Sequence, residues 1–369
     1  MTMCYLIRLM NFVRGNKVRY CYVRLIKLMR VHKRVRIGKG NTSSMRMDFG
    51  TSVELWICFY VGIVLSTVMG NVLILISIFK HSKLRDNMYL LIGNLAVSDL
   101  LVGIVLVPYY LLIDGGRFES GHGVIPLNKF TCLARPCIYV CCLGSSCISL
   151  LLISLERFLT LRFPLRAKIF ITRRRLFYAI GVSWAIVFIN GTLPLYGWSS
   201  YDETNHTCVS DEIITQEYKL LINWELITCL VVNFILYTSA VRIAYQHATD
   251  WRRRNSSCVV NQRTGVETEL HTIVTTVIVF GAFFLCWLPY IGAAIALTVN
   301  ENPVTQSIRR WALIPGFLNS GINWLIYGYR NSFFKASFKS ILTGRRIQRD
   351  GDRQASLPFG GSCKTITKV

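Results

Sequence analysis

The sequence predicts an all-α membrane protein: a seven-transmembrane helix bundle with a short amphipathic eighth helix. The chain is 52% hydrophobic and only 17% charged, with a mean hydropathy of +0.41, which is more apolar surface than a soluble core of 369 residues can enclose. Its long apolar segments are about twice the length of a barrel strand, so they predict helices. Basic residues cluster in alternate linkers, as expected for a chain that crosses the membrane repeatedly.

Seven segments are long and apolar enough to cross a bilayer as helices. Two of them contain an acidic residue, Asp99 in the second and Glu225 in the fifth. The predicted segments are 55–79, 87–113, 136–155, 176–198, 220–241, 272–299 and 311–329.

The charges of the linkers set the orientation. The linkers after the first, third and fifth segments and the C-terminal tail are rich in Lys and Arg, so they are predicted to be cytoplasmic. The longest opposite linker is acidic and contains the sequon Asn205-His206-Thr207, which predicts glycosylation outside the cell. We therefore expect a multi-pass plasma membrane protein with an extracellular N-terminus and a cytoplasmic C-terminus. The net charge of +23 then reflects basic loops at the lipid bilayer, and no nucleic-acid partner is expected.

Residues 1–52 form a basic N-terminal segment, followed by a seven-transmembrane domain at 53–330 and an amphipathic helix with a tail at 331–369. The first 50 residues contain twelve Lys or Arg and a single acid, Asp48. A basic flank normally stays in the cytoplasm, which conflicts with the predicted orientation. Two explanations are open: a basic extracellular tail, or translation that begins at Met45 or Met47.

Most of these segments contain a short characteristic motif. The motifs are Gly70-Asn71-Val72, Asn94-Leu95-Ala96-Val97-Ser98-Asp99, Cys132, Glu156-Arg157-Phe158, Trp184, Pro194, Phe283, Cys286-Trp287-Leu288-Pro289-Tyr290, Asn323 and Tyr327. With these motifs the chain resembles the rhodopsin-like (class A) G-protein-coupled receptors over about 48–342. The resemblance implies a receptor that binds an extracellular small molecule or short peptide and activates heterotrimeric G proteins, with arrestin as a further partner.

The resemblance also implies roles for buried polar residues. Asp99 is a mid-membrane carboxylate, which is costly unless it is paired. The family's sodium pocket would be formed by Asp99, Ser146, Asn319, Ser320 and Asn323. A hydrogen-bonded polar core without an ion is the alternative, and no other cofactor is expected.

At the cytoplasmic end, Arg157 would pair with Glu156 and with Glu269 of the sixth segment. Such a lock would hold the resting state closed against the G protein. Ordinary interfacial anchoring of Glu156 and Arg157 is the competing interpretation.

The residues implied to switch the receptor are Trp287, Pro289, Asn323 and Tyr327. Three features depart from the family pattern. The fifth segment has no proline between Lys219 and Arg254. Trp324 replaces a proline in the seventh segment, so the kink that directs Tyr327 is in doubt. Ala240 is aligned with a tyrosine that commonly stabilises the active state.

The resemblance further implies a disulfide between Cys132 and Cys208 and an aromatic ligand pocket with one acid. The expected pocket residues are Tyr109, Tyr110, Tyr139, Leu143, Trp224, Glu225, Thr228, Trp287, Tyr290, Ile291 and Leu313. Glu225 would bind a cationic group of the ligand or pair with Arg135.

The sequence departs from both the amine receptors and the adenosine receptors at positions that bind the ligand. Tyr139 replaces the aspartate of amine receptors. The stretches Glu269-Leu270-His271 and Cys286-Trp287-Leu288-Pro289 resemble adenosine receptors, but Ala294 replaces their purine-binding asparagine.

The region after Tyr329 predicts an amphipathic helix with Phe334, Phe338 and Ile341 on one face, lying on the inner leaflet. The final Thr367-Lys368-Val369 could bind a PDZ protein through its carboxylate.

The sequence fits neither the pattern expected of a transporter nor the pattern expected of an enzyme. A transporter or other polytopic helical protein is the alternative function, but the chain lacks corresponding halves. An enzyme is not expected, because six scattered histidines and the acids form no catalytic pattern.

Overall fold

The computed structural model describes residues 49–81, 84, 86–111, 128–202, 208, 213–254, 260–299 and 303–344. Within these ranges it describes the side chains except at 49–57, 251–254, 260–271, 297–299, 303–307, 309 and 310. The chain divides into two units, Met1–Phe49 and Gly50–Val369. The second unit contains the helices described below.

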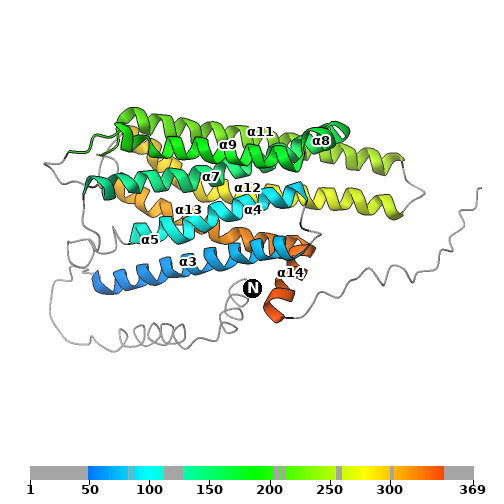
Figure 1. Cartoon of the computed structure of the whole chain (residues 1–369), viewed down its shortest axis with the longest axis horizontal. Helices are drawn as coiled ribbons and strands as arrows, with labels where there is room; N and C mark the ends of the chain where they lie inside the picture. Colours follow the sequence, from blue (N-terminus) through cyan, green and yellow to red (C-terminus); the bar gives the residue numbers. More distant parts are fainter. Residues whose placement is uncertain are drawn as a thin grey trace, which may run out of the picture. The chain divides into compact units, whose positions relative to one another are not determined.

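The described residues are almost entirely helical (Figure 1), apart from one isolated antiparallel bridge between Ser199 and Ile214. The helices in chain order are α3 (Phe49–Lys80), α4 (Asn87–Leu101), the π-helical turn η2 (Val102–Leu106), α5 (Val107–Tyr110), α7 (Lys129–Arg162), α8 (Pro164–Phe170), α9 (Arg173–Thr192), the 3₁₀ turn η4 (Leu193–Tyr196), α11 (Gln216–Arg254), α12 (Val260–Val299), α13 (Pro303–Arg330) and α14 (Ser332–Thr343).

Within the described residues, six helical stretches are long and apolar enough to cross a membrane. They begin in α3, α4, α7, α9, α11 and α12 and match the first six predicted segments. The seventh predicted segment lies in α13, which is less apolar because it contains Asn319, Ser320 and Asn323. These three residues are buried, so α13 turns its polar side to the bundle and not to lipid.

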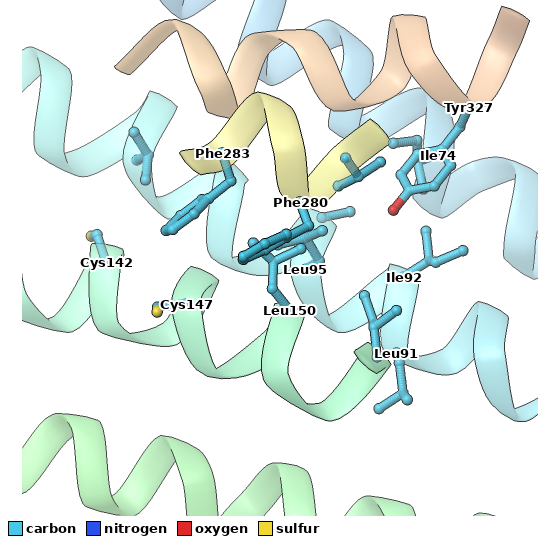
Figure 2. Close-up of a cluster of buried hydrophobic side chains, with 14 of the residues drawn as sticks. Ile74, Leu91, Ile92, Leu95, Cys142, Cys147, Leu150, Phe280, Phe283 and Tyr327 are labelled. Atoms are coloured by element: carbon cyan, nitrogen blue, oxygen red, sulfur yellow. The ribbon is translucent and has the colours of Figure 1, made fainter. Parts of the chain in front are cut away.

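Helix α7 occupies the centre of the bundle, where it packs against α4, α9 and α11. Helix α12 packs against both α11 and α13. Figure 2 shows the apolar core that results: Phe280 and Phe283 of α12 lie beside Leu150 of α7 and Leu95 of α4, with Tyr327 of α13 farther along. Because lipid provides no hydrophobic drive for helix association, this close packing is a main source of tertiary stability.

Side-chain hydrogen bonds join three of these helices at one level. The indole nitrogen of Trp184 donates to Asn94 Oδ1 at 2.9 Å, and Asn94 Nδ2 donates to Ser149 Oγ at 2.7 Å. Asn94 therefore connects α9 to α7 through α4. Two motif residues of the sequence, Asn94 and Trp184, thus have a structural role inside the bundle.

Trp324, which replaces the family's proline, packs against α3. Its indole ring lies against the α-carbon of Gly70 in α3, where a β-carbon would overlap it, and its nitrogen donates to Ser66 Oγ at 3.3 Å. The tryptophan is accommodated because α3 has glycine at this position. Tyr327, one turn further along, is buried and lies 5.6 Å from Phe334 between ring centroids.

Helix α14 is the predicted short eighth helix. Phe334 and Phe338 are buried, and Phe334 contacts the rings of Tyr327 and Tyr89. These two residues therefore attach the helix to the end of the bundle, and its position on the inner leaflet stays a prediction. Asn331 begins the helix by accepting backbone N–H bonds from Phe333 and Phe334.

We predict that Gly70→Ala lowers the apparent melting temperature of the detergent-solubilised protein. The added methyl must displace Trp324, and overpacking of this kind costs about 1–3 kcal/mol. The matched control is Gly62→Ala in the same helix, where a β-carbon would meet no atom within 4 Å. Equal melting temperatures for the two variants would contradict this account of the Trp324 contact.

Candidate functional site

The buried carboxylate of Asp99 lies at the centre of the candidate site. It is inaccessible to solvent and lies in the last turn of α4, which ends at Leu101 just before the π-helical turn η2. Asn323 Nδ2 of α13 donates to Asp99 Oδ2 at 2.7 Å, and Ser146 Oγ of α7 donates to Oδ1 at 3.4 Å. Three helices therefore meet at one carboxylate.

The remaining residues of the expected sodium pocket are also buried around this point. Asn319 and Ser320 are buried in α13. The amide oxygens of Asn319 and Asn323 are buried without a hydrogen-bond partner among the described residues. Unsatisfied buried acceptors are costly, and oxygen ligands are those that hard cations prefer. The residues present therefore fit a small hard cation.

Near the C-terminal end of α7, Arg157 forms an ion pair with the adjacent Glu156. Its Nη2 donates to Glu156 Oε1 at 2.7 Å, and its Nε donates to Oε2. Glu156 also accepts a longer bond of 3.4 Å from Thr160 Oγ1. The side chain of Glu269 lies outside the described residues, so the predicted contact between α7 and α12 stays a prediction.

Trp287 packs within a group of aromatic rings in the bundle. Its ring is 6.4 Å from Tyr139, 5.8 Å from Tyr290 and 6.2 Å from Phe283, between centroids. A β-carbon on Gly316 of α13 would lie 2.7 Å from the indole. The indole therefore rests directly on the α13 backbone, so a movement of Trp287 toward α13 would push against that helix.

Ala240 packs among Leu161, Ala244 and Ile273. One turn earlier in α11, Tyr237 is buried and stacks on Phe280 at 5.0 Å between centroids. Its hydroxyl has no hydrogen-bond partner in the described part of the chain, and it is the only tyrosine in the segment 220–241. The sequence analysis did not single out Tyr237, and the prediction based on Ala240 stays a prediction.

A cavity of about 400 Å³ opens above Trp287, between α7, α9, α11 and α12. Seven of the predicted pocket residues line it, and they are mostly aromatic or apolar. These are Tyr139, Leu143, Trp224, Glu225, Thr228, Trp287 and Tyr290. Many residues that the sequence analysis missed also line it, among them Asn190 and Val187 of α9 with Cys147 and Cys229.

Four predicted pocket residues do not line this cavity, namely Tyr109, Tyr110, Ile291 and Leu313. The ring of Tyr110 packs 5.7 Å from Phe317, and the guanidinium of Arg135 lies over it at 4.6 Å. Leu313 is buried in the core. The cavity described here therefore lies on the α9 and α11 side of Trp287, and Tyr110 and Leu313 pack elsewhere in the bundle.

Glu225 has a partner that neither sequence interpretation anticipated. Asn190 Nδ2 of α9 donates to Glu225 Oε1 at 2.7 Å. The carboxylate and the amide both line the cavity. They place one acidic group on a mostly apolar wall.

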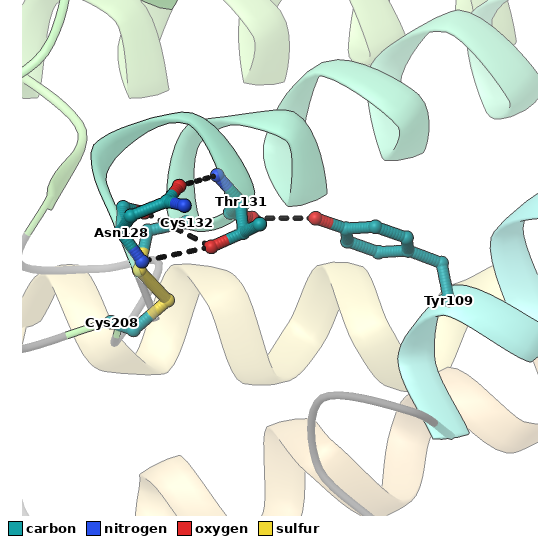
Figure 3. Close-up of a disulfide and its surroundings, with 5 residues drawn as sticks. All are labelled: Tyr109, Asn128, Thr131, Cys132 and Cys208. Carbon is teal, nitrogen blue, oxygen red and sulfur yellow. Dashed lines mark hydrogen bonds between the residues drawn. A yellow bond between two sulfur atoms is a disulfide. The ribbon is translucent and has the colours of Figure 1, made fainter. Parts of the chain in front are cut away.

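Near the N-terminal end of α7, the structure contains the disulfide between Cys132 and Cys208, with a Cα–Cα distance of 5.3 Å (Figure 3). Asn128 and Thr131 cap the helix reciprocally at 2.8 and 3.0 Å. Figure 3 also shows the hydroxyl of Tyr109 donating to the Thr131 carbonyl at 2.6 Å. Tyr109 therefore ties α5 to the start of α7. The predicted glycosylation site Asn205 lies outside the described residues.

A helical bundle with a buried mid-membrane carboxylate, an Arg–Glu pair at one end and a cavity at the other defines a polytopic membrane receptor. The profile of the 7 transmembrane receptor (rhodopsin family) matches residues 70–327. The chain belongs to this family. It is a G-protein-coupled receptor of the plasma membrane and not an enzyme, as the sequence predicted.

Known relatives include adenosine receptors. Adenosine receptor A2b of Mus musculus is 25% identical over 320 residues, covering 80% of this chain and 92% of the relative. The A2b receptor of Canis lupus familiaris is 26% identical over 319 residues, with coverage of 80% and 92%. Adenosine receptor A2a of Homo sapiens is 25% identical over 318 residues, with coverage of 81% and 74%.

Proposed function

We propose that this receptor responds to a small, mostly apolar molecule that carries one cationic or hydrogen-bond-donating group. The observation that supports this proposal is the cavity above Trp287, whose apolar wall presents the Glu225 carboxylate beside Asn190. A volume of about 400 Å³ is within the range of sites for drug-sized ligands. A buried charge on the ligand would find its counter-ion in Glu225.

The position of Trp287 supports a route from ligand to signal. A ligand in the cavity would touch Trp287 and Tyr139, and Trp287 rests on Gly316 of α13. Displacing the indole would therefore shift α13 relative to α12, and domain or helix shifts of this type are a common switching device.

We propose the orientation that the linker charges predict, with the N-terminus outside and the C-terminus in the cytoplasm. The disulfide at Cys132 supports it, because disulfides form and persist in oxidising compartments and this end of α7 then faces outward. Arg157 at the other end would face the G protein. Arrestin is a further proposed partner, and a PDZ protein would bind Thr367-Lys368-Val369, which lies outside the described residues.

Adenosine is the second candidate ligand, because relatives at 24–26% identity are adenosine receptors. Against it, Ala294 replaces the asparagine that binds purine in that subfamily. An alanine cannot donate or accept the side-chain hydrogen bonds of an amide. Adenosine therefore has weaker chemical support as the ligand than a cationic molecule that binds Glu225.

We also propose an allosteric sodium ion at Asp99. Among the described residues there is no cluster of three or more His, Cys, Asp or Glu side chains, so Asp99 supplies a single negative charge with neutral oxygens around it. One carboxylate balances one monovalent cation. Ser146, Asn319, Ser320 and Asn323 would provide the neutral oxygens.

The function is tested by nucleotide exchange on purified heterotrimeric G proteins, added to membranes that contain the receptor. We expect a protonated arylalkylamine such as tryptamine to increase exchange more than adenosine does, and Arg157→Ala to abolish the increase. Receptor levels are matched by surface labelling. A response to adenosine at lower concentration than to any cationic compound would favour the second candidate.

Sodium binding predicts a specific effect on stability. Raising sodium chloride at constant ionic strength, with N-methylglucamine as the replacement cation, should raise the melting temperature of the receptor, because an ion bound only to the folded state stabilises it. Asp99→Asn should remove this dependence by removing the charge. Equal melting curves in both salts for the wild type would disprove the sodium site.

Glu225→Gln should reduce the potency of a cationic agonist at least tenfold, since about 1.4 kcal/mol of interaction energy corresponds to a factor of ten. Glutamine keeps the size of the side chain and an oxygen that can accept from Asn190. The control is Glu217→Gln, an acid in the first turn of α11 that does not line the cavity. An unchanged dose–response curve for Glu225→Gln, at normal surface expression, would rule out the ligand contact.

A further inference from the structure

Two cysteine side chains from different helices meet in the wall of the cavity. The sulfur of Cys147 in α7 lies 2.7 Å from the sulfur of Cys229 in α11. A disulfide bond is about 2.05 Å long, so a small movement is enough to join them. Both cysteines are free, and they are separate from the disulfide at Cys132.

The polar contacts of the pair centre on Cys229. Asn233 Nδ2 points at the Cys229 sulfur from 3.5 Å and also donates to the Cys229 carbonyl at 2.9 Å. Asn233 is itself held by Ser154 Oγ, which donates to its Oδ1 at 3.0 Å. The Cys229 thiol also lies 3.6 Å from the Cys147 carbonyl, which can accept its hydrogen. The Cys229 sulfur thus has a donor and an acceptor beside it, and both fix its position next to Cys147.

Access differs between the two sulfurs. Cys147 is 4% exposed, and Figure 2 shows it on α7 near Phe283. Cys229 is only partly buried. Both line the cavity of about 400 Å³, which is large enough to admit a small oxidant to the pair.

We propose that Cys147 and Cys229 form a reversible disulfide when a hydroperoxide enters the cavity. The Cys229 thiolate attacks one peroxide oxygen and breaks the O–O bond, which gives a sulfenic acid and releases water, or an alcohol from a lipid hydroperoxide. The Cys147 thiol then attacks the sulfenic sulfur, forms the S–S bond and releases a second water. The two thiols lose two electrons and two protons in total, and the peroxide accepts them.

The disulfide would connect α7 to α11 beside Phe283 and Trp287, which line the same cavity. It would fix the separation of two cavity walls. The receptor's ligand site thereby becomes sensitive to peroxide through a covalent bond between its own helices.

The test uses the purified full-length receptor and needs no ligand, so its result is independent of the proposed function. The protein is treated with hydrogen peroxide or with bilayer-soluble cumene hydroperoxide, alkylated with N-ethylmaleimide and digested without reduction. Mass spectrometry should then find the Cys147 peptide joined to the Cys229 peptide, with two hydrogens fewer than the separate thiol peptides. Dithiothreitol should restore both thiols.

Matched variants identify the sulfur on α7. Cys142→Ser removes another buried cysteine of the same helix and should keep the cross-link, whereas Cys147→Ser and Cys229→Ser should abolish it. Oxidation should also raise the melting temperature of the wild type and of Cys142→Ser, but not of Cys147→Ser. Absence of the cross-linked peptide from oxidised wild type, or its persistence in Cys147→Ser, would overturn the proposal.

Discussion

A carboxylate in the middle of a bilayer constrains everything around it. Asp99 is fully buried, and an isolated charge at this depth is costly unless other groups or an ion compensate it. The compensation comes from helices distant in sequence, because Asn323 of α13 and Ser146 of α7 both donate to the carboxylate. The positions of α4, α7 and α13 are therefore coupled through one side chain, and a change in its charge acts on all three.

Glycines set the closest helix contacts in this bundle. Trp324 lies on Gly70, Trp287 on Gly316, and the ring of Phe338 within 2.9 Å of the β-carbon position of Gly328. In each case a large ring takes the space that a side chain on the glycine would need. Lipid tails are as apolar as the helix surfaces, so dispersion at such contacts replaces the hydrophobic drive of a soluble core. Trp324 is tolerated in place of the family's proline for this reason.

The aromatic rings extend from the cavity into the core of the bundle. Tyr139 and Tyr290 contact Trp287 at the cavity, Trp287 contacts Phe283, and Phe280 stacks on Tyr237 deeper in the bundle. Trp287, Phe283, Phe280 and Tyr237 belong to one buried cluster. A displacement of Trp287 by a ligand would therefore act directly on the side chains of this core.

The sequence by itself determined the class of the protein, the membrane-spanning segments and the motif residues, because hydropathy and helix length are local properties. It also anticipated the convergence of Asn323 and Ser146 on Asp99, through the family resemblance. Tertiary structure alone decided the partner of Glu225, the glycine beneath Trp324, the stacking of Tyr237 on Phe280 and the burial of Phe334. These depend on the rotation of each helix about its axis and on the residue that faces it, and a periodic apolar segment does not specify either.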